Sequence, residues 1–428
     1  MIPRRLFLRS LSIVPAFPLM NLSCSGINAS PGMVYLKSIL DILKKIRKNE
    51  INSIRDAANL FAETIISRNR CFIYTADSAT STLLNETVKD LPRVFFPLHT
   101  TSMAETVREG DALLTTHPGE IPETAVKKGA YTIGITSPGI IDCYDGKDTI
   151  QFSVKQYLKP LTNTLIHSYL PIWDGLVMLP EYPFGILPGS APVHFSLITA
   201  IAGETYGRSG GIGLTGNSIP EDASHFLDTL LERITRLVNY RDTFRKAGEI
   251  AAGSLLKNGR VWVYDGQGIL RKEIISGAGV PLFAHSISRK EIGDGTLKAG
   301  DVLLFGALGS NNSDDLNVIR QTSNITDKII TFCPHDETGG YRLYNDSAVS
   351  LDNLSHDRNG LRIFDNGQRR SMHTGIIMNS ILLWTVLGEA TGFIIHSGEI
   401  PCYLMGTYLA GSQQYNADAR LKAEHRGY

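Results

Sequence analysis

The sequence has no excess of charge of either sign, because 42 Lys and Arg residues are matched by 42 Asp and Glu residues among 428. Without a net charge, no overall electrostatic field draws the protein towards nucleic acid or an anionic membrane surface. Its hydrophobic content of 43% is that of a folded protein and excludes disorder as the main state. At about 150 residues per domain, the chain has room for two or three domains.

Long apolar runs are also missing, since none after the N-terminus reaches the roughly 20 residues of a membrane-spanning helix. The longest, 376–387, predicts a core helix. At the N-terminus, Arg4 and Arg5 precede Phe-Leu and the moderately apolar stretch 11–20, a pattern typical of a twin-arginine export signal. Cys24 follows in an incomplete lipoprotein box. We expect an exported protein, periplasmic or lipid-anchored at Cys24; the alternative is a cytoplasmic protein with a short interfacial helix.

Cysteine is scarce, and no pair of the five cysteines has the close spacing of a metal site. Buried free thiols are therefore the prediction for Cys71, Cys143, Cys333 and Cys402. The sequence has no phosphate-binding Gly-x-x-x-x-Gly-Lys-Ser/Thr loop and no His-Glu-x-x-His, which argues against that type of nucleotide hydrolysis and against zinc chemistry. The glycine-rich stretch 209–216 follows a predicted helix rather than a strand and is interpreted as an inter-domain linker.

Three sequence matches recur in the same order along the chain. Two are offset by 190 residues and the third by 185, which chance explains poorly. We therefore predict an export signal over 1–30 and two related domains, over 35–225 and 226–428. The matched pairs are 69–74 with 259–264, Gly110-Asp111 with Gly300-Asp301, and Gly203-Glu204 with Gly388-Glu389.

Each half alternates helical and strand patterns, which predicts an α/β fold with two tandem, doubly wound parallel sheets of the flavodoxin type. Ligands of such sheets bind beyond the carboxyl ends of the strands, where helix N-termini offer free N–H groups. The expected strands are 71–75, 93–96, 112–115 and 131–136, then 260–264, 302–306 and 328–333. The expected helices include 80–91 and 120–128, then 243–257, 269–277 and 313–321.

Five motifs follow one another in a characteristic order in the first half: the turn 74–78, Glu86, Glu109-Gly110-Asp111, the turn 115–120, and Gly-Ala-x-x-Ile-x-Ile-Thr-Ser at 129–137. This order of motifs resembles the sugar isomerase (SIS) domain, and the resemblance covers nearly the whole chain after the signal. The segment 171–175 is similar to the one that closes that domain, and 398–403 with Asn416 and Tyr428 resembles the tail of an uncharacterised bacterial SIS-domain group.

The resemblance implies a small-molecule partner, a phosphorylated or acidic sugar, with no cofactor, no metal and no nucleic acid. SIS enzymes pair two domains about a pseudo-two-fold axis, which a duplicated chain supplies by itself and which also allows a homo-oligomer.

Both phosphate-binding turns of the family are altered in this sequence. The first lacks glycine, and in the second Pro118 removes an N–H donor. In the second half, Asp265 and Asp314 would repel a dianionic phosphate unless they face away. Hydroxyl and amide side chains in these turns could bind ligand, cap the following helix, or do both. The candidate ligand-binding residues are Ser78, Thr80, Ser81, Thr116, Gly119, Glu120, Gln267, Ser310, Asn311, Asn312 and Ser313.

Aldose–ketose isomerisation needs a base that moves a proton between C1 and C2, and an acid that opens the ring. Glu86 and Glu273 fall in the helix after strand one, where many SIS proteins place a glutamate that faces the ligand. Glu204 and Glu389 each follow an apolar helical stretch, where burial would raise the pKa; the alternative is that they project into solvent. His117 is the acid candidate by position. The sequence leaves two functions open, a sugar isomerase and a non-catalytic sugar-derivative-binding or scaffolding protein.

Overall fold

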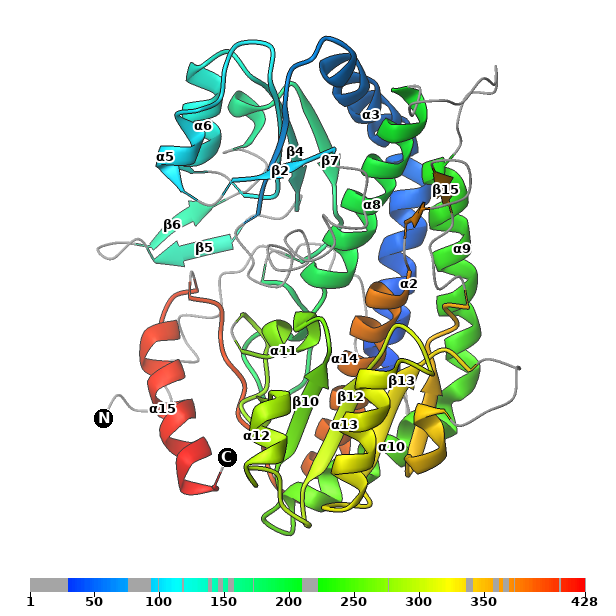
Figure 1. Ribbon diagram of the computed structural model, residues 1–428. Helices are drawn as coiled ribbons and strands as arrows, with labels where there is room; N and C mark the ends of the chain where they lie inside the picture. The colour runs from blue at the N-terminus through cyan, green and yellow to red at the C-terminus, as the bar shows by residue number, and fades with distance from the viewer. Residues whose placement is uncertain are drawn as a thin grey trace.

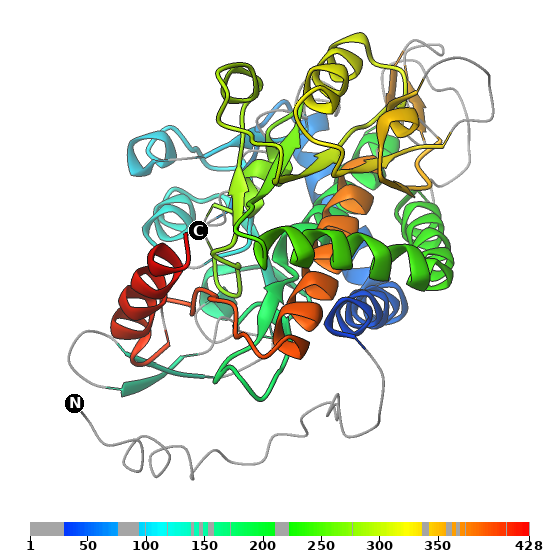
Figure 2. The same ribbon diagram turned by 90° about the horizontal axis from the view of Figure 1, so that it is seen from below.

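The structure is a computed structural model, shown in Figure 1 and, from below, in Figure 2. It describes residues 30–75, 94–98, 100–117, 119–137, 141–144, 149–152, 158–171, 173–209, 222–275, 277–335, 342–356, 362–364, 369–372, 374–407 and 409–427.

The first half contains a five-stranded parallel sheet in the order β2-β1-β3-β4-β7. Numbered by their appearance in the chain, the strands follow the order 2-1-3-4-5, which is the flavodoxin-type arrangement. The expected strand at 93–96 is shorter and later than predicted. The strands are β1 (Cys71–Tyr74), β2 (Phe96–Pro97), β3 (Ala112–Thr115), β4 (Tyr131–Thr136) and β7 (Thr164–His167).

The second half repeats this sheet with the same strand order, β11-β10-β12-β13-β14, again entirely parallel. The predicted fold class, with two doubly wound parallel sheets, is therefore confirmed. The strands are β10 (Val261–Asp265), β11 (Ala284–Ser286), β12 (Val302–Gly306), β13 (Ile329–Cys333) and β14 (Val349–Asp352).

Helices cover both faces of each sheet, and Figure 1 shows the two sheets in the upper and lower parts of the molecule with long helices between them. The expected helix 269–277 is shorter than predicted: α11 ends at Glu273, and Gly277 and Gly279 beyond it adopt positive φ angles, which do not continue a helix. The helices are α2 (Pro31–Asn49), α3 (Ile51–Ile66), α5 (Thr101–Ala104), α6 (Glu120–Lys127), α8 (Ser190–Arg208), α9 (Asp222–Leu237), α10 (Arg241–Leu255), α11 (Ile269–Glu273), α12 (Arg289–Gly293), α13 (Ser313–Ser323), α14 (Gly375–His396) and α15 (Ser412–His425), with 3-10 turns Lys159–Leu161, Val238–Tyr240 and Leu343–Asp346.

Three antiparallel hairpins and a peripheral helix complete the described part of the chain. Figures 1 and 2 both show α15 at the edge of the molecule. Asn416 anchors this helix, because its side chain accepts from the Met405 N–H at 2.8 Å and donates to the Met405 carbonyl at 2.9 Å. The hairpins pair β5 (Ile141–Tyr144) with β6 (Thr149–Phe152), β8 (Gly175–Val177) with β9 (Ile186–Pro188), and β15 (Arg362–Phe364) with β16 (Arg369–Ser371).

The sequence repeat is also visible in the hydrogen bonds that begin each sheet. Asp111 accepts from the Arg70 N–H at 2.8 Å, and Asp301 accepts from the Arg260 N–H at 2.9 Å. Each aspartate thereby ties the start of its half's first strand to the turn before the neighbouring strand. The Gly-Asp match is therefore a structural element of the fold, and both carboxylates are buried.

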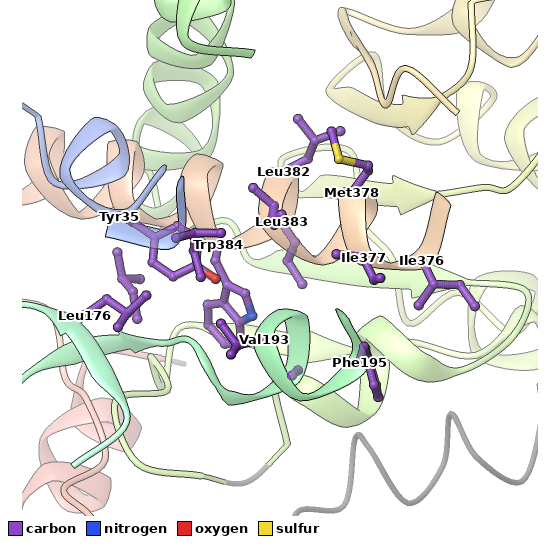
Figure 3. Close-up of a cluster of buried hydrophobic side chains, with 14 of the residues drawn as sticks. Tyr35, Leu176, Val193, Phe195, Ile376, Ile377, Met378, Leu382, Leu383 and Trp384 are labelled. Carbon is purple, nitrogen blue, oxygen red and sulfur yellow. The ribbon is translucent and has the colours of Figure 1, made fainter. Parts of the chain in front are cut away.

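One continuous hydrophobic core runs between the two sheets. Alternate strand residues such as Ile73 and Val263 face this core, while Phe72 and Trp262 face the outer helices, as the period of two in a strand requires. Figure 3 shows Tyr35 of α2, Val193 of α8 and Trp384 of α14 within it. The core thus joins both halves of the sequence.

Helix α14 is the one helix of the described residues that is long and apolar enough to cross a membrane, but 89% of its apolar window is buried inside the protein. This placement agrees with the predicted core helix at 376–387. Cys71, Cys333 and Cys402 are buried free thiols, as expected; the side chain of Cys143 lies outside the described residues.

Candidate functional site

The strand order creates one point in each sheet where a ligand crevice is expected. Between the first and third strands of a 2-1-3-4-5 sheet, the two following connections leave on opposite faces and open a crevice at the carboxyl ends. These points lie between β1 and β3 in the first half and between β10 and β12 in the second. Most of the turn after β1 lies outside the described residues. The crevice between β10 and β12 is therefore the one whose two flanking turns are both described.

Asp265 ends β10 at this crevice and is buried. Its Oδ2 accepts from the Ile269 N–H at 2.7 Å and its Oδ1 from the Arg271 N–H at 3.2 Å, so the carboxylate holds the first turn of α11. The Arg271 Nε lies 3.7 Å from Oδ1. Burial raises the pKa of Asp265, opposed by these N–H groups and by Arg271.

A small pocket opens beside Asp265, lined by Gln267, Leu308, Ile376 and Asn379 among others. Asn379 donates to the Ala307 carbonyl at 3.0 Å and accepts from Asn353 Nδ2 at 2.8 Å, which fixes the direction of its amide. Gln267 is half-buried, and no described residue forms a hydrogen bond with its amide. The pocket therefore combines apolar walls with one carboxylate and two amides, and with a volume of about 10 Å³ it has room for a single hydroxyl group or water.

Asp315, in the first turn of α13, lies close to the turn that follows β10. The residue is only 7% exposed, and a Cβ placed on Gly266 would lie 3.2 Å from its Oδ1, so the carboxylate lies beside the turn after β10. Burial raises the pKa of Asp315 to about 6, with a further contribution from the charges of Asp265 and Asp314. No described residue donates a hydrogen bond to this carboxylate.

The predicted ligand-binding residues of the second half lie in different environments. Asn312 is the N-cap of α13, because its Oδ1 accepts from the N–H groups of Asp314 and Asp315 at 2.9 and 3.1 Å. Ser310 is fully buried, and its carbonyl accepts from the Leu343 N–H at 3.0 Å. Asn311 and Ser313 are exposed at the start of α13. Of this group, Gln267 is the residue that lines the pocket.

In the first half, the turn after β3 closes partly on itself. The Thr116 N–H donates to the Tyr74 carbonyl at 3.1 Å, and Thr115 Oγ1 donates to the His117 carbonyl at 2.7 Å. The His117 side chain is exposed. Gly119 takes φ 143° as the residue before α6, and Glu120 is the first residue of that helix. The remaining predicted residues, Ser78, Thr80, Ser81 and Glu86, lie outside the described residues.

Glu204 and Glu389 occupy equivalent places, and each caps a helix of the opposite half. Glu204 on α8 accepts from the Ala223 N–H at the start of α9 at 3.0 Å and binds Arg208 at 2.7 Å. Glu389 on α14 accepts from Ser30 Oγ and from the Met33 N–H at the start of α2.

Both glutamates are buried, so the alternative that they project into solvent is wrong. Burial raises the pKa of Glu389, as expected. The contacts of the two carboxylates are those of helix caps, which favours a structural role.

Glu273 is also buried, at the end of α11. Its Oε2 accepts from Ser380 Oγ and from Trp384 Nε1, both at 2.7 Å and both from α14. The carboxylate therefore binds α11 to the central helix. The placement of a buried glutamate in the helix after strand one agrees with the SIS pattern, although its described partners are core side chains.

Asp315, Asn353 and Asn379 were not among the candidates drawn from the sequence. Asn379 sits inside an apolar run, where an amide must find partners, and this is the signal that could have identified it. Asp315 stands in the first turn of a helix, where aspartate is common because it interacts favourably with the helix dipole. Its sequence position therefore gave no sign that it would be buried at the crevice.

No family model matches the sequence, and no curated protein matches it. Solved structures do match the fold. A proposed tagatose-6-phosphate ketose/aldose isomerase from Clostridium novyi NT is similar with a TM-score of 0.51 and 11% identity, over 89% of this chain and 94% of that chain. A proposed sugar-binding protein from Salmonella typhimurium LT2 is similar with a TM-score of 0.50 and 11% identity, over 83% of this chain and 99% of that chain.

At this identity the likeness concerns the fold. It agrees with the two doubly wound sheets described above and with the fold that the SIS resemblance implies.

Proposed function

We propose that this protein is an exported binder of a sugar derivative, and that it holds the sugar at the carboxyl ends of its parallel sheets. The observation that carries the proposal is the pocket at the β10–β12 crevice, where Asp265, Gln267 and Asn379 converge beside Leu308 and Ile376. It lies at the point where the strand order makes ligand binding favourable, and its polar side chains are of the kind that bind one hydroxyl group of a sugar whose ring rests at the mouth of the pocket.

Binding without isomerisation is the form of the function that we favour. Proton transfer between C1 and C2 needs a carboxylate that can reach the sugar. Glu204 and Glu389 are engaged in helix caps and Glu273 binds two side chains of α14, which supports a structural use of all three.

Calorimetric titration of the purified protein against a sugar panel tests the proposal. The panel contains glucose, glucosamine, gluconate and the 6-phosphates of glucose and glucosamine. We expect Gln267→Met to weaken binding of the best sugar by about tenfold, the loss of one hydrogen bond to the ligand. Gln321→Met, on the exposed side of α13, is the matched control and should bind as the parent does. Equal affinity of both variants and the parent would place the site elsewhere.

A second measurement separates binder from isomerase. Any sugar that binds is incubated with the protein in heavy water, and NMR follows exchange at the C1 and C2 positions. We expect no exchange above the background of the sugar alone. Exchange that depends on the protein would establish an isomerase and would contradict the non-catalytic form.

A further inference from the structure

A cavity of about 440 Å³ lies at the outer edge of the second sheet, between the edge strand β11 and helix α15, which Figure 1 shows beside this sheet. Among the described residues, it shares no lining residue with the pocket beside Asp265. Its volume falls within the range of small-molecule sites, about 300–1,000 Å³. The apolar part of its wall is formed by Ile274, Ile275, Val280, Leu282 and Leu404. The cavity is therefore a separate candidate site, for a ligand with an apolar part.

The edge of β11 that faces away from β10 has unpaired backbone groups. The register of the two strands and the bond from the Ile287 N–H to the Val263 carbonyl direct the N–H and the carbonyl of His285 towards β10. The backbone groups of Ala284 and Ser286 therefore point to the open edge, and no other described residue bonds to them. Both residues line the cavity. The strand thus offers N–H donors and carbonyl acceptors to a ligand.

His285 contributes a polar ring whose hydrogen-bonding capacity the protein does not use. Its Nε2 is buried and forms no hydrogen bond within the described part of the chain, which is rare for a buried polar atom. The ring centroid lies 5.4 Å from that of Trp262, and both residues line the cavity. Burial lowers the pKa of His285 and the charge of Arg260 lowers it further, so the imidazole is neutral at pH 7. This part of the wall is therefore polar but uncharged.

Two opposite charges stand on the α15 side of the cavity. Arg420 and Glu424 both line it and lie one helical turn apart, at positions i and i+4. Both residues are exposed, and neither side chain forms an ion pair with another described residue. Because the arginine is N-terminal to the glutamate, the two have the less favourable orientation for pairing with each other. The helix therefore presents a separate cation and a separate anion to the cavity.

The ligand that complements both sides of the cavity carries a cation and an anion close together, next to an apolar group. A simple carboxylic acid would leave Glu424 unmatched, and a simple amine would leave Arg420 unmatched. A neutral sugar has neither charge and no extended apolar part for the wall. These requirements together describe a zwitterion with an apolar side chain.

We propose that the cavity between β11 and α15 binds a free apolar α-amino acid, with Arg420 as the cation that receives its carboxylate and Glu424 as the carboxylate that receives its ammonium group. Its side chain packs against the apolar wall. The unpaired N–H and carbonyl groups of Ala284 and Ser286 supply further donors and acceptors for the same two ends. Charge-assisted hydrogen bonds are about twice as strong as neutral ones, so both ends of the ligand should contribute to affinity. This inference is independent of the proposed sugar-binding function.

Calorimetric titration of the purified protein at pH 7 with L-leucine, L-phenylalanine and L-tryptophan tests this inference. The tightest of the three is then compared with its amide, which lacks the carboxylate, and with its deaminated acid (3-phenylpropanoate for phenylalanine), which lacks the ammonium group. We expect each of these two analogues to bind at least about tenfold more weakly than the amino acid.

Two variants assign the two ends of the ligand. In Arg420→Gln, the difference in affinity between the amino acid and its amide should fall to about twofold or less. In Glu424→Gln, the difference between the amino acid and its deaminated acid should fall in the same way. Lys422→Gln is the matched control, because Lys422 is exposed on the same helix and does not line the cavity; both differences should persist in it.

Three outcomes would overturn the inference. The first is that none of the three amino acids binds, and the second is that either analogue binds as tightly as the amino acid. The third is that either variant leaves its difference unchanged. None of these outcomes concerns the crevice between β10 and β12, so the proposed sugar binding stands or fails by its own titration.

Discussion

At the residue scale, Asp315 is a largely buried carboxylate at the start of α13. Burial disfavours its charged form, and the nearby charges of Asp265 and Asp314 add repulsion, so the ionised carboxylate weakens the native state.

The pKa of Asp315 predicts how stability depends on pH. In the folded protein the pKa of the Asp315 carboxyl is about 6, above its ordinary value of 3.8. Because the folded pKa is raised, its contribution to stability is fully present below pH 3.8 and is lost as the pH rises through 6. Asp315→Asn should therefore raise the free energy of unfolding at pH 8, by up to about 3 kcal/mol, and give no such gain at pH 4. Urea unfolding at the two pH values measures both. An equal effect of the substitution at pH 4 and pH 8 would contradict the raised pKa.

At the scale of elements, the long helices approach each other unusually closely. A Cβ on Gly32 of α2 would lie 2.3 Å from the Thr385 carbonyl of α14, and a Cβ on Gly248 of α10 would lie 2.3 Å from the Glu389 Cβ. Glycine at these points lets two helices from different halves pack against the central helix. The same approach brings the Glu389 carboxylate to the start of α2.

Gly32→Ala should separate α2 from α14 and destabilise the protein by about 1–3 kcal/mol, the usual cost of overpacking. Gly253→Ala is its matched control, because Gly253 is also helical but has no atom within 4 Å of the added Cβ. That variant should be neutral or stabilise by up to about 1 kcal/mol, since alanine favours the helix. The comparison is made by thermal and urea unfolding. Similar destabilisation by both substitutions would show that helix propensity, and not the close contact, decides the result.

At the scale of the whole molecule, the two halves exchange their first helices. The helix that begins each half, α2 or α9, is capped by a glutamate on a long helix of the other half, Glu389 on α14 or Glu204 on α8. The main core contains side chains from both sheets and from all the long central helices. Neither half can bury its apolar surface alone, so the two should fold as one cooperative unit.

Division of the chain within 210–221, in the glycine-rich stretch, tests this dependence. We expect fragments 30–209 and 222–428 to co-purify when they are produced together, because each supplies a helix that packs on the other. Produced separately, each should aggregate or lack a cooperative unfolding transition, measured by circular dichroism. Two independently stable fragments would show that the exchanged helices are dispensable.

The export proposal belongs to the same scale and concerns residues outside the described part. Lysine in place of both Arg4 and Arg5 keeps the positive charge but removes the arginine pair that a twin-arginine signal requires. The double variant should accumulate in the cytoplasm, and cell fractionation measures this. A variant distributed as the parent is would contradict the signal.

The central strands of both sheets could be predicted from the sequence, because each is a short apolar run bounded by turn residues. The 190-residue repeat fixed the equivalence of β1 with β10 and of β3 with β12. The outer strands β7, β11 and β14 were not predicted. They are only three or four residues long and contain polar residues such as Thr164, His285 and Ser350, so neither their length nor their pattern separates them from loops.

What the sequence determined by itself is therefore local and periodic: the α/β class, the duplication and the turns that follow the strands. What only the tertiary structure decided is which polar groups find partners. Glu204 and Glu389 bind helix ends that lie far away in the sequence, and Asn312 caps its own helix. The carboxylate of Asp315, three residues further on, is largely buried beside Gly266, in the turn after a different strand. Burial and pairing depend on contacts between distant segments, and these contacts have no period that a sequence pattern can display.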